Sequence, residues 1–159
     1  MAVTSALHSL FQNVIFLSAI TSLCIAQVIK MVIYLLTNRI KKPLEAIETV
    51  IWRTGGMPSS HSAIVCSLAT STGMTEGISS NMFIFSIVFA MIVLRDSVGV
   101  RRSTGLQAKA LNTLGKQTAE KTGLKFHSVK EIQGHAPLEV LAGAVLGIII
   151  AICFFLILT

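Results

Sequence analysis

Four apolar runs dominate this 159-residue chain and limit what it can fold into. They extend over about Leu10–Leu36, Ser59–Met74, Asn81–Leu94 and Pro137–Leu158. A helix needs about 20 apolar residues to cross the hydrocarbon core of a bilayer. The first and last runs have that length, and the third reaches it if its helix continues towards Val100. We therefore expect an all-α integral membrane protein with about four transmembrane helices.

The composition supports this class. Charged residues make up 13% of the chain, apolar residues 53%, and the mean hydropathy is +0.77, whereas a soluble domain carries about 25% charged residues. The net charge of +6 comes with only 6% aromatic residues, so we expect no nucleic-acid partner. The length predicts a single membrane domain over residues 1–159.

The basic residues are confined to two windows of the sequence. Five of the 13 Lys and Arg residues lie in Lys30–Arg53 and eight in Arg95–Lys130. Four spans place both windows on one face of the membrane, and the positive-inside rule makes that face cytoplasmic. We therefore expect a multi-pass protein of the cell membrane with both termini outside.

The polar windows also predict one or two interfacial amphipathic helices. The first covers Pro43–Trp52, and the second carries its apolar residues at helical spacing, at Leu106, Ala110, Leu111 and Leu114. Lys30 lies near the end of the first apolar run, where a lysine can extend to the lipid headgroups.

The composition of the runs predicts how they pack. The second run is rich in Ser, Thr and Ala and should pack closely on its neighbours, whereas the bulkier third run should face lipid. Gly143 and Gly147 form a small-residue face on the last helix, through which a homodimer could form. We expect Cys24, Cys66 and Cys153 to be buried small hydrophobic residues.

The first polar motif is Gly-Gly-Met-Pro-Ser-Ser-His-Ser, residues 55–62. Either Ser59 or Ser60 can cap the helix that follows Pro58, which places His61 in its first turn. Helix N-termini favour anions, so a phosphate could bind here and His61 could act as a general acid. The alternative is that the serines only cap the helix and His61 faces lipid headgroups.

The second motif is Gly-His-Ala-Pro-Leu-Glu, residues 134–139. Pro137 suits the first position of the last helix, so His135 precedes that helix and Glu139 lies in its first turn. If the two side chains meet, Glu139 can orient the imidazole of His135 as a nucleophile. The alternative is that Glu139 only complements the helix dipole. Both histidine motifs fall on the predicted cytoplasmic face, which favours one shared site.

Phosphoryl transfer also needs fixed positive charge on the phosphate oxygens. Arg101 and Arg102 are the best-placed candidates, just past the third run, and Arg53, Lys130 and Lys30 are further ones. Asp96 either pairs with an arginine or binds a divalent cation; one carboxylate makes a weak magnesium site. We therefore expect no obligatory cofactor.

These motifs resemble those of the type 2 phosphatidic acid phosphatase / vanadium haloperoxidase superfamily. Pro58-Ser59-Ser60-His61 resembles its Pro-Ser-Gly-His motif, and the segment from His135 to Gly143 resembles its nucleophile segment, His-x-x-x-Asp. The whole chain, including Asp-x-x-Gly-Val-Arg-Arg at 96–102, is similar to a short divergent membrane branch of that superfamily. Here Ser60 replaces a family glycine, Glu139 replaces an aspartate, and Val129 stands at the position of a family arginine.

The resemblance implies a phosphohistidine at His135, acid catalysis by His61, and a lipid phosphate or diphosphate as substrate. In this interpretation Arg101, Arg102, Ser59 and Ser60 bind the phosphate. Two alternatives stay open. One is a non-catalytic membrane protein of the same fold that binds anionic lipid or a partner, and the other is a small lipid transporter.

Overall fold

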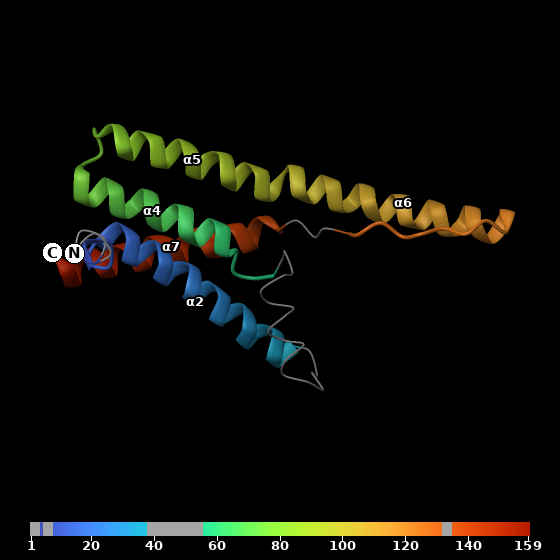
Figure 1. Ribbon diagram of the computed structural model, residues 1–159, viewed down its shortest axis with the longest axis horizontal. Helices are drawn as coiled ribbons and strands as arrows, with labels where there is room; N and C mark the ends of the chain where they lie inside the picture. Colours follow the sequence, from blue (N-terminus) through green and yellow to red (C-terminus); the bar gives the residue numbers. More distant parts are fainter. Residues whose placement is uncertain (1–3, 5–7, 38–55, 132–134) are drawn as a thin grey trace.

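The computed structural model describes residues 4, 8–37, 56–131 and 135–159, and the described residues are helical in five long segments. In chain order these are α2 (Val14–Thr37), α4 (Ser60–Glu76), α5 (Asn81–Val98), α6 (Val100–Thr122) and α7 (Pro137–Leu158). Helices α2, α4, α5 and α7 form a bundle, and α6 projects from one end of it (Figure 1). The predicted all-α fold is confirmed.

Helix α4 is the centre of the bundle. It packs against α7, α2 and α5, and more than half of its 17 residues are buried. Its Ser- and Ala-rich sequence leaves room for close backbone approach, since a Cβ atom added to Gly147 would lie 2.1 Å from the carbonyl oxygen of Ala63. The expected close packing of this segment is therefore confirmed.

Three helical stretches are long and apolar enough to cross a membrane: Val14–Thr37, Asn81–Thr122 and Pro137–Leu158. The second begins with α5 and runs on into α6. Large apolar side chains on the outside of the bundle, such as Val28 on α2, Phe85 and Met91 on α5 and Leu156 on α7, are more than half exposed. Exposed apolar surface of this extent suits a lipid environment.

Helix α6 and the segment after it form an arm. Backbone hydrogen bonds continue through Gly99, whose N–H donates to Arg95 and whose carbonyl accepts from Ser103, so α6 extends α5 (Figure 1). After Gly123 the chain runs back along α6 in an extended form. The side chain of Asn112 bonds both backbone groups of Val129, at 2.9 Å each.

The structure corrects the expectation for two cysteines, and one expected helix falls outside the residues that it describes. Cys66 is buried as expected, but Cys24 and Cys153 are exposed on the outside of their helices. The interfacial helix expected at Pro43–Trp52 falls outside the described residues. Helix α6 forms where a helix was predicted, but it continues α5 and projects from the bundle instead of forming a separate interfacial helix. Its residues Leu106, Leu111 and Leu114 are exposed.

Candidate functional site

The two histidine motifs meet where the N-termini of α4 and α7 come together. The N–H of Ser59 donates to the carbonyl oxygen of Glu139 at 2.9 Å, which joins the N-cap of α4 to the first turn of α7. One turn further along α7, a Cβ atom on Gly143 would lie 2.2 Å from the carbonyl oxygen of Ser59. The absence of a side chain at Gly143 therefore permits this approach.

This contact changes the interpretation of the small-residue face. Gly143 and Gly147 face α4 of the same chain, so the face expected to serve a homodimer is already occupied within the monomer. A homodimer stays a prediction, and it would have to use another surface. The small residues instead bring the two helix N-termini, with their positive dipole ends, to one place.

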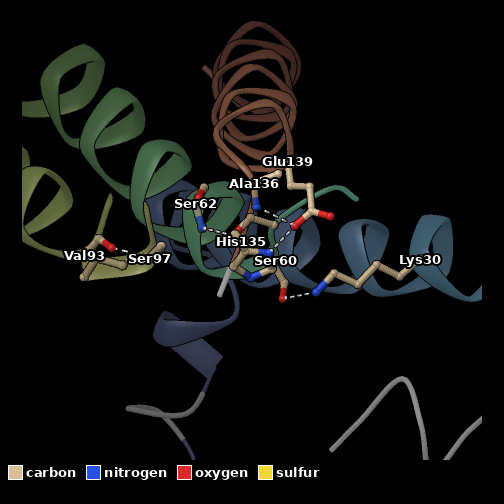
Figure 2. Close-up of polar contacts among 9 residues, drawn as sticks. Lys30, Ser60, Ser62, Val93, Ser97, His135, Ala136 and Glu139 are labelled. Carbon is tan, nitrogen blue, oxygen red and sulfur yellow. Dashed lines mark hydrogen bonds and ion pairs between the residues drawn. The ribbon is translucent and has the colours of Figure 1, made fainter. Parts of the chain in front are cut away.

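His135 and Glu139 form the best-defined polar contact at these helix ends (Figure 2). The Nδ1 atom of His135 lies 2.9 Å from Oε2 of Glu139. Because an ionised carboxylate can only accept, Nδ1 is the donor of this contact, and in the neutral form of the ring the lone pair is then on Nε2. The same carboxylate oxygen accepts from the N–H of Ala136 at 3.1 Å. Glu139 therefore caps its helix and fixes the imidazole at the same time.

Lys30 joins this cluster from α2. Its side chain is only 9% exposed, and Nζ donates to Oγ of Ser60 at 3.0 Å. It also lies near enough to Glu139 for electrostatic attraction. The expectation that Lys30 extends to the lipid headgroups is therefore wrong: its ammonium points into the bundle, towards the first turn of α4 (Figure 2).

The remaining residues of the first motif take the positions that the sequence predicts. Ser59 is the N-cap of α4, and its Oγ accepts from the N–H of Ser62 at 3.4 Å. His61 follows in the first turn of α4, with an exposed side chain. Its exposure contrasts with His135, which is 4% exposed. One histidine is thus buried at the joined helix ends, and the other is exposed in the first turn of α4.

The other predicted arginine and lysine ligands of the phosphate are either exposed or outside the described part of the structure. Arg102 is exposed in the first turn of α6, and Lys130 is exposed on the returning segment of the arm. Arg53 and the side chain of Arg101 lie outside the described part of the structure. At the neighbouring end of α5, Ser97 is buried and its Oγ donates to the carbonyl oxygen of Val93 (Figure 2).

The described residues contain no group of three or more His, Cys, Asp and Glu side chains that could hold a metal ion. Asp96 lies near the C-terminal end of α5, half-buried. The cation that these residues do bring to the helix ends is the ammonium group of Lys30. Sequence reasoning gave Lys30 a minor role, although a lysine inside an apolar run, three residues after Gln27, could have indicated a buried polar site.

Comparison with known proteins finds a relative and a family for this chain. The chain is 35% identical, over 156 residues, to the uncharacterized membrane protein YuiD of Bacillus subtilis (strain 168), covering 90% of this chain and 94% of that protein. No solved structure matches the chain. Residues 11–150, which include both histidine motifs, match the Divergent PAP2 family. The protein therefore belongs to the Divergent PAP2 family.

Proposed function

We propose that this protein is a membrane phosphohydrolase that cleaves a lipid-linked phosphate or diphosphate through a phosphohistidine at His135. The observation that carries the proposal is the contact between His135 Nδ1 and Glu139 Oε2, at 2.9 Å. It orients the ring so that Nε2 can attack a phosphorus atom. Membership of the Divergent PAP2 family supports the same chemistry.

In the first step the lone pair of His135 Nε2 forms a bond to phosphorus. The bond between phosphorus and the lipid oxygen breaks, and His61 donates a proton to that oxygen as it leaves. The ring of His135 becomes a cation while it carries the phosphoryl group, and the carboxylate of Glu139 stabilises that charge. His61 suits the acid role because it is exposed in the first turn of α4, where a leaving group can reach it.

In the second step water attacks the phosphorus atom and the bond between nitrogen and phosphorus breaks. His61 accepts the proton of the water, inorganic phosphate leaves, and His135 returns to its neutral form. The transferred group carries negative charge throughout. Lys30 and the positive dipole ends of α4 and α7 would stabilise it, with Ser59 and Ser60 nearby. Arg101 and Arg102 would add charge from the start of α6.

The proposal includes a position in the membrane. We infer that α4 crosses the bilayer with the three apolar candidate spans, since 17 helical residues measure about 26 Å and its neighbours shield its hydroxyl groups. The arm and both histidine motifs then lie at one face, with the start of α2 and the end of α7 at the other (Figure 1). The basic residues of the arm make that face cytoplasmic.

The experiment uses the full-length protein, purified in detergent. Phosphatidate, phosphatidylglycerophosphate and polyprenyl diphosphate are offered, and inorganic phosphate is measured. We expect release from at least one lipid, and its loss in His135→Ala. Lipid binding without release, unchanged in His135→Ala, would favour the binding protein. Lipid flux across sealed vesicles without release would favour the transporter.

A further inference from the structure

Lys30 is a buried lysine whose ammonium is hydrogen-bonded to the hydroxyl of Ser60. Both residues are buried, at 9% and 4% exposure, and the ammonium donates to the hydroxyl at 3.0 Å. Removing a lysine ammonium from water is costly unless it is paired. An ammonium has three donors; among the described residues one of them bonds the neutral hydroxyl of Ser60, and the carboxylate of Glu139 attracts the ammonium from nearby. A further anionic group beside Lys30 would therefore stabilise its buried ammonium.

Ser60 is well suited to hold this group. It is the first residue of α4, directly after Ser59, whose N–H is bonded to Glu139. The hydroxyl therefore projects from a backbone that is fixed against the first turn of α7. Lysine has a long, flexible side chain and loses considerable rotamer entropy when its end is fixed. Without the hydroxyl, the ammonium could turn away towards water and lipid headgroups.

We propose that Ser60 is a positioning residue for Lys30: its hydroxyl holds the ammonium at the joined N-termini of α4 and α7, ready for the phosphate group before the lipid arrives. The inference rests on the proposed function, because it deepens the role of the same site. It requires Ser60 to act through Lys30. The loss of binding free energy in the double variant must therefore be smaller than the sum of the losses in the two single variants.

A double-mutant cycle tests this requirement. Wild type, Ser60→Ala, Lys30→Met and the double variant are purified in full length. The dissociation constant of orthovanadate is measured for each protein, together with phosphate release from phosphatidate. We expect Ser60→Ala to weaken vanadate binding about tenfold. In the Lys30→Met background, the same change should alter binding by less than about twofold.

Two further variants separate positioning from stability. Ser60→Thr keeps the hydroxyl and should restore vanadate binding to within about threefold of wild type. Ser67→Ala is the matched control: Ser67 is a fully buried serine of the same helix whose Oγ has no hydrogen-bond partner in the part of the chain that the structure describes. Its loss should leave binding and release unchanged. If Ser60→Ala does not fold, Ser60→Gly takes its place in the cycle.

The outcomes distinguish the two proposals. Additive losses in the cycle, or no rescue by Ser60→Thr, would overturn the positioning role of Ser60. Coupled vanadate binding without phosphate release from any lipid would support the positioning role but overturn the hydrolase. Wild-type protein that does not bind vanadate would contradict both.

Discussion

At the scale of single residues, Glu139 has two hydrogen-bonding roles that the sequence presented as alternatives. Its Oε2 atom accepts from Ala136 at the start of α7 and contacts Nδ1 of His135. A helix cap and an orienting carboxylate are therefore combined in one side chain. This links the formation of α7 to the orientation of the proposed nucleophile.

Glu139→Gln separates these roles. The amide oxygen of Gln can still accept from Ala136, so α7 should form normally, but the neutral side chain cannot stabilise a cationic His135. We expect phosphate release to fall by at least about a hundredfold, with a melting temperature close to that of wild type. Glu139→Asp is the control that keeps the charge. A Glu139→Gln protein with wild-type turnover would show that the carboxylate is only a cap.

His61→Ala tests the proposed acid. Loss of the proton donor should slow release from an alkyl phosphate by about 10²–10⁴-fold. The first-turnover release of the leaving group from an aryl phosphate should be slowed much less, because that leaving group needs no proton. First-turnover rates on the two substrates are compared in one preparation, because the later hydrolysis of the phosphohistidine uses His61 for both substrates. Equal losses on both would assign His61 to binding or folding instead of proton transfer.

At the scale of helices, the close contact between α4 and α7 builds the site. The contact depends on Gly143 and Gly147, which lie against backbone atoms of α4. Backbone atoms cannot move aside as a side chain can, so an added methyl group must push the helices apart. Small residues on α7 therefore determine how closely Ser59 approaches Glu139.

Gly143→Ala should destabilise the protein by about 1–3 kcal/mol and reduce phosphate release, because the added Cβ atom would displace Ser59. Thermal unfolding in detergent measures the first effect. Val145→Ile is the control, since it adds one carbon to a half-exposed side chain of the same helix and should change stability by less than about 0.5 kcal/mol. A Gly143→Ala protein as stable as the control would contradict the tight contact.

In the arm, Asn112 holds the segment after Gly123 against α6. Its side chain bonds Val129 twice and also Glu131 Oε1, at 2.8 Å, and the ring of Phe126 lies against Gly115. Asn112→Ala should release the returning segment, so that trypsin cuts at Lys125 and Lys130 at least about tenfold faster. Thr113→Ala, at an exposed neighbouring position, is the control. Unchanged cleavage in Asn112→Ala would show that other contacts hold the segment.

At the scale of the whole molecule, hydropathy alone predicted the helices closely. The last run, Pro137–Leu158, matches α7 residue for residue, because Pro137 and the end of the apolar run mark its limits. The meeting of the two motifs was also expected from the distribution of basic residues. Three-dimensional packing could not be predicted in this way. Hydropathy does not reveal which face of a helix is covered, so the expectations for Lys30 at the headgroups and for a buried Cys24 were both wrong.

The topology can be tested by labelling. Single cysteines at Ile78, which is exposed in the turn between α4 and α5, and at Thr118, on the arm, are introduced after the three native cysteines are replaced. In sealed vesicles of defined orientation, an impermeant thiol reagent should label Thr118→Cys only from the cytoplasmic face and Ile78→Cys only from the opposite face. Labelling of both positions from one face would contradict four spans.

The most direct test of the account is to trap the intermediate. The protein is mixed with a lipid that carries ³²P in its terminal phosphate, quenched in alkali within the first turnover, and digested for mass spectrometry. Phosphate on the nitrogen of His135, absent in His135→Ala, is the result that the account predicts. Phosphate release by wild type that continues undiminished in His135→Ala, with no labelled histidine, would contradict it.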